Sequence, residues 1–573
     1  MRGGKVEAVE VGLIIFKNLF TGPFYSETGP VSYLKLKGKV VDVLNENIFE
    51  GVVSVEDGRI VDIQRKKNDR NRYIMPGFVD SHVHVESSML SPTEFSRVVV
   101  QHGTVAAVCD PHEIANVLGL DGIRFMIKEG NRAPLKFNFG APTCVPATPF
   151  ETNGAELGLE KLRELLETEE ISHLSEVMDF TGVINGKEEL LEKIELAREY
   201  CLKIDGHAPG LRGEELSKYI SAGIETDHES TSLENAREKV EKGMKIQIRE
   251  GSASRDFDEL VDLIDDFPGE CMFCTDDIKV NDLIDRHIDS MVGEAVKRDI
   301  DLIKVLKAAC VNPVLHYDLD VGLLREGDPA DFIVVDDLEN FKVERSYIDG
   351  EEVYSRSEVS RKSDTVKSTP NNFRVERKRS DDFRVKKKEG KLRVIGVNDE
   401  NILTEEIIER AKTEEGHVVA DTERDILKLA VLNRYEESEP AVGFVQNFGL
   451  EEGAIASSVL HDSHNLAAVG TDDRAICEAM NAVIEEKGGL SAVSNGEKKI
   501  LPLPIAGLMS DRGYEEVEKK FEELKEIVDN MGCDLTSPYM TLSFMALLVI
   551  PNLKLSDKGL FDVKKSEFVD IFV

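Results

Sequence analysis

The sequence predicts an α/β protein with a (β/α)8 TIM-like barrel, a small flanking β-domain and a C-terminal α+β domain. Three observations indicate this fold class. Between residues 74 and 320, eight short apolar runs alternate with helix-like segments, as in such a barrel. Strand-like runs separated by turns flank this segment on both sides. From about residue 392, helix-like and strand-like segments mix without that regular alternation.

The small β-domain is expected to combine residues 1–73 and 321–355. Residues 40–43, 51–55 and 60–63 have the composition of strands, and the Asp57-Gly58 step before the last of them is a hairpin signal. A similar pattern returns between residues 330 and 350. We therefore assign one β-domain to both flanks of the barrel.

The barrel itself is assigned to residues 74–320. Helix-like segments such as 157–166 and 187–203 separate its strands. The eight predicted strands occupy residues 74–84, 104–109, 136–140, 173–178, 204–207, 225–228, 245–249 and 272–276.

The remaining chain divides into a polar basic segment, residues 356–391, and the C-terminal domain, residues 392–573. We interpret the basic segment as a solvated linker or an exposed strand pair, and not as a nucleic-acid-binding patch, because no aromatic platform for stacked bases accompanies it. The domain that follows contains helix-like segments at 405–411, 422–431 and 514–531, and strand-like runs at 441–446, 454–460 and 466–469.

Composition narrows the functional classes. With 71 basic and 109 acidic residues, the chain carries a net charge of −38, which makes it a poor partner for nucleic acid or an anionic membrane. No apolar run approaches the roughly 18 residues of a membrane-spanning helix. Eight cysteines without a dense framework fit a reducing compartment. We therefore expect a cytoplasmic protein that binds neither nucleic acid nor membrane.

Histidines follow the ends of several predicted barrel strands, although the chain has only 12 of them. His82 and His84 end the first strand, and two-residue spacing points both side chains to the same side. His207, His228 and Asp276 follow the ends of later strands. Barrel active sites lie at the carboxyl ends of the strands, and imidazole with carboxylate suits a divalent cation. Core packing does not explain this arrangement.

A second cation requires a bridging anion from the middle of the barrel. Glu176 ends the fourth predicted strand and can serve as that bridge. Glu176, Asp276 and a bridging hydroxide reduce the charge of two dications to about +1, which is enough to hold hydroxide at neutral pH.

Longer motifs carry a family resemblance. The segment Pro76-Gly77-Phe78-Val79-Asp80-Ser81-His82-Val83-His84 resembles the signature of the amidohydrolase superfamily. More specific motifs are similar to the adenine deaminase family, and the similarity covers nearly the whole chain, including the second unit that most amidohydrolases lack. These motifs are Glu86-Ser87-Ser88-Met89-Leu90, Asp110-Pro111-His112-Glu113-Ile114, Cys144-Val145-Pro146, Glu176-Val177-Met178-Asp179-Phe180, Asp205-Gly206-His207-Ala208-Pro209-Gly210 and His461-Asp462-Ser463-His464-Asn465.

The resemblance implies an enzyme of purine salvage that hydrolyses adenine to hypoxanthine and ammonia. It also implies two divalent metal ions, Mn or Fe in first place and Zn as the alternative. We expect adenine as the small-molecule partner and a homo-oligomer as the assembly. By motif, the resemblance implies that His82, His84 and Asp276 bind one metal. His207 and His228 bind the other, and Glu176 bridges the two. The implied ligands are His82, His84, Glu176, His207, His228 and Asp276.

The expected reaction also needs groups that move protons and hold the purine. Asp276 lies against the proposed metals, so it can take the hydroxide proton and pass it to the departing ammonia. Attack at C6 breaks the aromaticity of the purine ring, and a proton or a strong hydrogen bond at N1 must compensate for that loss. The candidates for that role are Glu86, His112 and Glu113, which follow early strand ends. We assign His112 and Glu113 to the catalytic group and Glu86 with Ser87 to substrate binding. The alternative for Glu113 is a charge at the start of a helix.

Three other groups receive structural interpretations. His461-Asp462-Ser463-His464 is too compact in sequence for a hydrolase triad and is interpreted as a structural turn; a loop at the barrel mouth and a third metal site remain alternatives. Cys271 and Cys274 are interpreted as strand packing without a second pair to complete a metal site. His102 and His287 are interpreted as surface or structural residues.

Two competing functions remain open. Another binuclear amidohydrolase, acting on a cyclic amide, would be favoured by a carboxylated lysine and an arginine two positions after the His pair; this chain has Glu176 and Glu86 there. A non-catalytic metal-binding scaffold would be favoured by a missing ligand, whereas every ligand position is filled.

Overall fold

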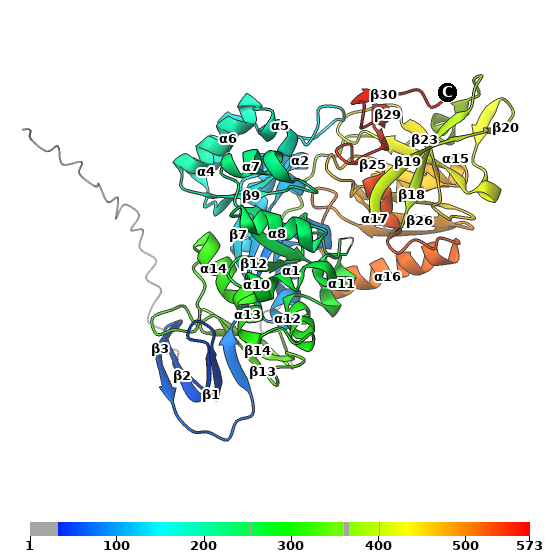
Figure 1. Cartoon of the computed structure of the whole chain (residues 1–573). Helices are drawn as coiled ribbons and strands as arrows, with labels where there is room; N and C mark the ends of the chain where they lie inside the picture. Colours follow the sequence, from blue (N-terminus) through cyan, green and yellow to red (C-terminus); the bar gives the residue numbers. More distant parts are fainter. Residues whose placement is uncertain (1–32, 253, 357, 360–365, 400) are drawn as a thin grey trace, which may run out of the picture.

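The computed structural model describes residues 33–252, 254–356, 358–359, 366–399 and 401–573. Three parts are evident in Figure 1: a small sheet at one end, a central barrel, and a C-terminal unit beside the barrel. The N-terminal part of the predicted β-domain, residues 1–32, lies outside the described residues.

An eight-stranded sheet takes strands from both flanks of the barrel segment, in the order β16-β15-β14-β13-β4-β1-β2-β3. Asp57 and Gly58 form the tight turn between β2 and β3, and both have positive φ angles, 48° and 78°. The strands are β1 (Tyr33–Asp42), β2 (Asn47–Glu56), β3 (Arg59–Arg65), β4 (Tyr73–Pro76), β13 (Phe332–Val335), β14 (Val343–Ile348), β15 (Glu351–Ser355) and β16 (Glu358–Val359).

The first predicted barrel strand is two strands. Residues 73–76 form β4 of the small sheet, and the barrel begins with β5. The break falls at Gly77, where an added Cβ would lie 2.3 Å from the side chain of Val105, so only glycine fits between the two sheets.

The barrel consists of eight short strands that pair in parallel, and an isolated parallel bridge between Val83 and Asp276 joins the last strand to the first. Most residues of these strands are buried. They are β5 (Phe78–Val83), β6 (Thr104–Cys109), β7 (Lys136–Phe139), β8 (His173–Val177), β9 (Lys203–Gly206), β10 (Thr226–Asp227), β11 (Lys245–Arg249) and β12 (Cys271–Cys274).

Helices surround these strands, as Figure 1 shows. They are α1 (Pro92–Val99), α2 (His112–Leu118), α3 (Leu120–Gly130), α4 (Leu159–Thr168), α5 (Phe180–Ile184), α6 (Glu188–Glu199), α7 (Gly213–Ser221), α8 (Leu233–Glu241), α9 (Phe257–Leu260), α10 (Leu263–Asp266), α11 (Val280–Asp285), α12 (Ile288–Lys297), α13 (Leu302–Leu306) and α14 (Asn312–Tyr317).

The C-terminal unit is built on a second eight-stranded sheet, ordered β19-β18-β23-β22-β25-β24-β26-β27. Its strands are β18 (Leu392–Asn398), β19 (Asn401–Glu409), β22 (Ile426–Leu432), β23 (Ala441–Gln446), β24 (Ala454–Ser457), β25 (Leu466–Gly470), β26 (Gly489–Ser494) and β27 (Glu497–Pro502). Smaller sheets contain β17 (Val385–Lys386), β20 (Lys412–Glu414), β21 (His417–Val419), β28 (Leu553–Ser556), β29 (Gly559–Asp562) and β30 (Glu567–Phe568).

Three helices complete this unit: α15 (Asp473–Glu486), α16 (Tyr514–Asn530) and α17 (Pro538–Phe544). Asp472 caps α15 by accepting hydrogen bonds from the backbone N–H groups of Arg474 and Ala475, and the helix buries an apolar face against the sheet. Helix α16 packs against α1 and α11 of the barrel, and the Tyr514 N–H donates to Glu94 at 3.0 Å. The two units therefore share a packed interface.

Two predicted helices of the C-terminal unit are wrong. Residues 405–411 belong largely to β19, which pairs with β18, and residues 422–431 fall mainly in β22. All seven residues of β22 are buried between neighbouring strands. A run buried on both faces has no alternation that distinguishes strand from helix.

Particular residues of the described part from 366 onward depart from the interpretation of residues 356–391 as a solvated linker. Val375 and Phe383 are buried in the core of the C-terminal unit. The Lys378 ammonium binds Glu437 and donates to the Ser438 carbonyl at 2.8 Å. Val375, Phe383 and Lys378 therefore contribute to the packing of the unit that they precede.

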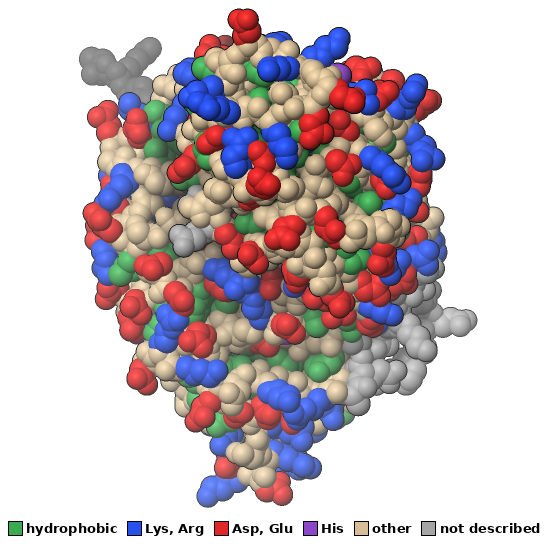
Figure 2. All heavy atoms as spheres, turned by 90° about the vertical axis from the view of Figure 1, so that its right-hand side faces the viewer, with side chains coloured by type: hydrophobic (Ala, Val, Ile, Leu, Met, Phe, Trp, Pro, Cys, Tyr) green, Lys and Arg blue, Asp and Glu red, His purple; other side chains and the backbone are tan. Residues whose placement is uncertain are grey.

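The surface is strongly charged. Figure 2 shows acidic and basic side chains interspersed over one face, with few hydrophobic side chains among them. Across the part of the chain that the structure describes, we find no helix with the length and apolar character needed to span a membrane.

Candidate metal centre

The structure brings the six predicted ligands together at the carboxyl ends of the barrel strands. Asp276 Oδ1 lies 3.1 Å from His84 Nε2 and 3.6 Å from His82 Nε2. Glu176 Oε1 lies 3.4 Å from His84 Nε2, and its Oε2 lies 3.3 Å from His228 Nε2 and 2.7 Å from His207 Nδ1. Glu176 is therefore placed between the two histidine groups.

The donor set and its unpartnered atoms fit divalent cations. Both ring nitrogens of His82 and the Nδ1 of His228 are buried without a hydrogen-bond partner among the described residues. The two rings stack with centroids 4.1 Å apart. Buried polar atoms normally have partners, so these nitrogens point to absent ligands. Imidazoles and carboxylates without thiolate suit Zn, Fe or Mn.

Both carboxylates of the cluster are held in the ionised form. Burial alone would raise the pKa of Glu176, but His207 and His228 hold it well below its usual range. Burial opposes ionisation of Asp276 in the same way, and there His84 and Arg249 hold the pKa well below its usual range. Each is therefore available as an anionic ligand.

Arg249 fixes the orientation of Asp276. Its Nη1 donates to Asp276 Oδ2 at 3.0 Å, while its Nε donates to Asp256 at 2.9 Å and the guanidinium also contacts Glu229. This leaves Asp276 Oδ1 facing His84. The backbone of Asp276 has a φ of 55°, in the left-handed region, so the turn itself is held in a rare conformation.

A fully buried ion pair supports the loops that carry His207 and His228. The Lys239 ammonium donates to Asp227 Oδ2 at 2.8 Å and to the Ala208 carbonyl at 2.7 Å, and Asp227 Oδ1 accepts from the Ala208 N–H at 2.9 Å. Sequence reasoning missed this pair. Its one signal was an aspartate directly before the predicted ligand His228.

Glu86 and Ser87, the predicted substrate-binding residues, lie at the start of the loop after β5. Glu86 Oε1 accepts from the Ile114 N–H at 3.1 Å, which fixes the beginning of α2, and its Oε2 has no partner among the described residues. Burial raises the pKa of Glu86 to about 7. The Ser87 hydroxyl donates to Asp277, beside the ligand Asp276.

His112 lies directly against the cluster. Its Nδ1 hydrogen-bonds Asp110 Oδ2 at 3.0 Å and lies 3.6 Å from Glu176 Oε1. Its Nε2 lies 3.7 Å from Glu113 Oε1, beyond hydrogen-bonding distance. His112 therefore has its Nδ1 fixed by Asp110 beside Glu176, while its Nε2 points toward Glu113 without a hydrogen bond to it.

Glu113 connects the barrel to the C-terminal unit. Its two carboxylate oxygens accept hydrogen bonds from His461 Nδ1 and His464 Nε2. Burial would raise the pKa of Glu113, but these two histidines hold it well below its usual range. The interpretation of residues 461–464 as a mere structural turn is therefore wrong, because the segment forms part of the barrel mouth.

Other predicted residues lie away from the centre. His102 contacts Asp289 at 3.1 Å, and His287 hydrogen-bonds Thr104 Oγ1 at 2.8 Å. Cys271 and Cys274 are free thiols buried within β12.

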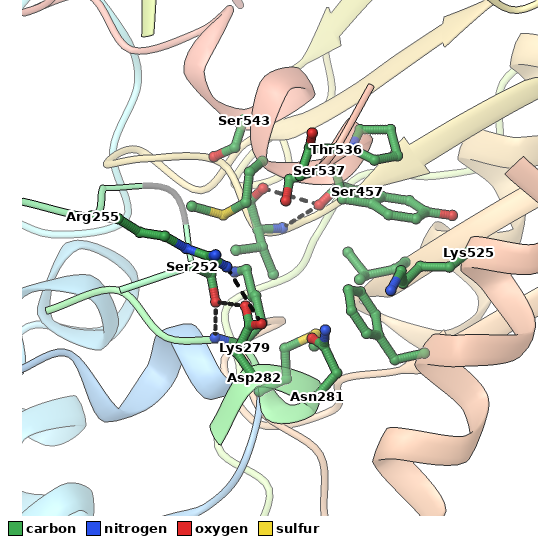
Figure 3. Close-up of a pocket in the computed structure, with 17 residues that line it drawn as sticks. Ser252, Arg255, Lys279, Asn281, Asp282, Ser457, Lys525, Thr536, Ser537 and Ser543 are labelled. Carbon is green, nitrogen blue, oxygen red and sulfur yellow. Dashed lines mark hydrogen bonds and ion pairs between the residues drawn. The ribbon is translucent and has the colours of Figure 1, made fainter. Parts of the chain in front are cut away.

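A cavity of about 140 Å³ lies between the loops of the barrel and the C-terminal unit. Figure 3 shows Ser252, Lys279 and Asp282 on its barrel side, and Ser457 and Ser543 on the other. None of the six predicted ligands lines it. Ser543 Oγ also accepts from the His461 N–H at 2.9 Å, so the cavity adjoins the loop that reaches Glu113.

Comparison with known families gives two matches. Residues 73–353 match the amidohydrolase family, and residues 401–567 match the adenine deaminase C-terminal domain. Together they span both units of the structure.

Similar curated proteins align over nearly the whole chain. An adenine deaminase of Salinibacter ruber is 52% identical over 549 residues, covering 95% of this chain and 100% of that protein. An adenine deaminase of Sulfurovum sp. is 51% identical, covering 94% and 99%, and one of Methanosarcina mazei is 48% identical, covering 94% and 99%. Among solved structures, a β-aspartyl dipeptidase of Fervidobacterium islandicum aligns with a TM-score of 0.46 and 15% identity, over 59% of this chain and 100% of that one.

Proposed function

The chain belongs to the adenine deaminase family, and from this premise we propose how its residues carry out the hydrolytic deamination of adenine. The reaction converts adenine and water into hypoxanthine and ammonia, a step of purine salvage. The observation that carries the proposal is the buried histidine and carboxylate cluster at the carboxyl ends of the barrel strands.

The family implies a divalent metal centre, and the buried cluster fits one. We propose two ions, Mn or Fe in preference to Zn. His82, His84 and Asp276 would hold one and His207 with His228 the other, with Glu176 shared between them. When bound, such ions supply Lewis-acid activation of water at neutral pH.

Asp276 is proposed as the residue that transfers the proton. Its Oδ2 is fixed by Arg249, and its Oδ1 faces the cluster. The water oxygen bonds to C6 of the purine, and Asp276 takes a proton from it. Asp276 then gives that proton to the exocyclic nitrogen as the C6–N bond breaks and ammonia leaves, and the second proton of the water ends on N1 as C6=O forms.

His112 is proposed to face the purine ring during attack at C6. Asp110 fixes its Nδ1, and its Nε2 lies too far from Glu113 for a hydrogen bond, which leaves that nitrogen free for N1 of the ring. Glu113 keeps its predicted catalytic role only indirectly, since both of its oxygens accept from histidines. The unpartnered Oε2 of Glu86 and the Ser87 hydroxyl remain proposed substrate contacts.

A substrate panel tests this function against the cyclic-amide alternative. Protein reconstituted with Mn, Fe or Zn is incubated with adenine, adenosine, dihydrouracil or hydantoin, and ammonia release is followed. We expect ammonia from adenine only. Protein that binds two metals per chain without deaminating adenine would refute the proposal.

We further propose that the enzyme is a cytoplasmic homo-oligomer. The eight free cysteines fit a reducing compartment. The oligomeric state is measured by light scattering coupled to size-exclusion chromatography.

A further inference from the structure

We propose that His461 and Asp462 of the C-terminal unit bind the five-membered ring of the free purine base and thereby distinguish a base from a nucleoside. The inference rests on the function proposed above and names the residues that select its substrate. No group of the barrel is assigned this task in the mechanism above.

The loop between β24 and β25 reaches the metal centre through two contacts. His461 hydrogen-bonds Glu113 through its Nδ1. An oxygen of the Asp462 carboxylate lies within 4.8 Å of a ring nitrogen of His112 and a carboxylate oxygen of Glu113. His112 in turn lies 3.6 Å from the proposed bridging Glu176. One side chain thus separates Asp462 from the metal ligands.

Two atoms of this loop are buried without a partner. His461 Nε2 and Asp462 Oδ2 have no hydrogen-bond partner among the described residues, and these two residues are only 4% and 5% exposed. His464 differs, because its Nδ1 accepts from the Leu460 N–H at 3.2 Å and its Nε2 donates to Glu113. Leaving a buried polar atom unpaired is costly, so these two positions indicate a ligand that supplies both partners.

The chemistry of the two atoms matches a free purine better than a third cation. Asp462 can accept a hydrogen bond from a ring N–H, and His461 Nε2 can donate to a ring nitrogen. Burial works against a charged His461, but Glu113 raises its pKa to about 9, so Nε2 keeps its proton at neutral pH. The protonated His461 Nε2 would repel a cation, and both oxygens of Glu113 already accept hydrogen bonds from histidines.

The five-membered ring of free adenine carries one N–H donor and one acceptor nitrogen, whereas adenosine has lost the N–H to its ribose. A carboxylate that accepts from this N–H therefore favours the base. Sites built to hydrogen-bond a substrate N–H discriminate strongly against analogues that lack it, because the buried acceptor is then left unpaired.

The test compares Asp462→Asn with a matched control, Asp557→Asn, in the metal-reconstituted full chain. Asp557 lies at the same interface but already accepts from the Thr152 N–H at 3.0 Å. We expect Asp462→Asn to lower kcat/KM for adenine about 10- to 100-fold, mainly through KM. The control should stay within about twofold of the wild type. Metal content and thermal unfolding are measured for each protein.

Inhibition by hypoxanthine and its N-methyl forms locates the contact. Asp462→Asn should weaken inhibition by hypoxanthine about tenfold or more and leave inhibition by 9-methyl- or 7-methylhypoxanthine unchanged, since the latter lack the N–H. Unchanged adenine kinetics in Asp462→Asn would overturn the proposal. Loss of a bound metal ion in that variant would overturn it in favour of a cation site.

The design separates this inference from the function on which it rests. Failure of the wild type to deaminate adenine would refute the proposed function. Calorimetric titration of adenine and 9-methyladenine into wild type and Asp462→Asn would still decide whether Asp462 contacts the ring: a weaker affinity for adenine alone supports the contact, and equal affinities contradict it.

Discussion

At the scale of single residues, the candidate centre separates ligands from the groups that orient them. Glu176 lies between the histidines of both halves, whereas Asp276 contacts two histidines with one oxygen and Arg249 with the other. The motif at residues 82–84 and the later strand ends indicated this set from the sequence. Arg249 could not be predicted, because its contact with Asp276 depends on the direct pairing of β11 with β12.

Asp276→Asn should separate metal binding from proton transfer. The amide preserves the shape and one oxygen donor but cannot take a proton from water, so we expect much of the metal to remain and kcat to fall about 10²- to 10⁴-fold. Metal analysis and ammonia release are measured on the same sample. Full activity in this variant would contradict the proposed role of Asp276.

Glu176→Ala should reduce metal content to fewer than two ions per chain. The alanine removes the one carboxylate that lies near histidines of both groups. The control is Glu94→Ala, which removes a buried carboxylate paired with Arg97 away from the cluster. If elemental analysis finds the same two ions in Glu176→Ala as in the control, the bridging role is wrong.

At the scale of secondary-structure elements, short barrel strands present the ligands and buried ion pairs hold the loops between them. The eight strands followed from alternating apolar and helical segments in the sequence. The strands of the C-terminal sheet were harder to predict, since residues 426–432 form an apolar run that is compatible with a buried helix or a central strand. Pairing with β23 and β25 decides the outcome there.

Lys239→Met should disturb the second half of the metal site. It leaves Asp227 as an unpaired buried charge, so we expect the free energy of unfolding to fall by about 3 kcal/mol. Metal affinity should fall about 10- to 100-fold, because the loops of His207 and His228 lose their shared anchor.

The control is Lys428→Met, which removes another buried lysine, paired with the partly exposed Asp473 in the C-terminal unit. Chemical denaturation should show a smaller loss of stability there, because solvent reaches Asp473, with unchanged metal affinity. Equal metal affinities in the two variants would show that Lys239 contributes stability alone.

At the scale of the whole molecule, the C-terminal unit completes the mouth of the barrel. Glu113 and His461 are separated by 348 positions in the chain yet form a direct hydrogen bond. The interface cavity in Figure 3 lies against the same loop. Residues of both units therefore border the candidate site, although their motifs lie far apart in the sequence.

Removal of metal should destabilise the folded chain. Ions that bind only the folded state stabilise it by mass action, and the buried nitrogens of His82 and the Nδ1 of His228 have no protein partner among the described residues without them. Dialysis against a chelator should lower Tm by about 5 °C or more, and added Mn²⁺ should restore it. An unchanged Tm, measured by calorimetry with metal content confirmed, would contradict a tightly bound centre.

The sequence by itself determined the barrel, the joining of its two flanks in one sheet, and the composition of the candidate centre. These features follow from local periodicity and from the rule that parallel strands end at one face. Only the tertiary structure decided that residues 461–464 lie against Glu113, that Lys239 ties the loops of His207 and His228 together, and that Val375 and Phe383 pack in the C-terminal core. Those contacts join segments far apart in the chain, and their partners depend on how whole elements pack rather than on any local pattern.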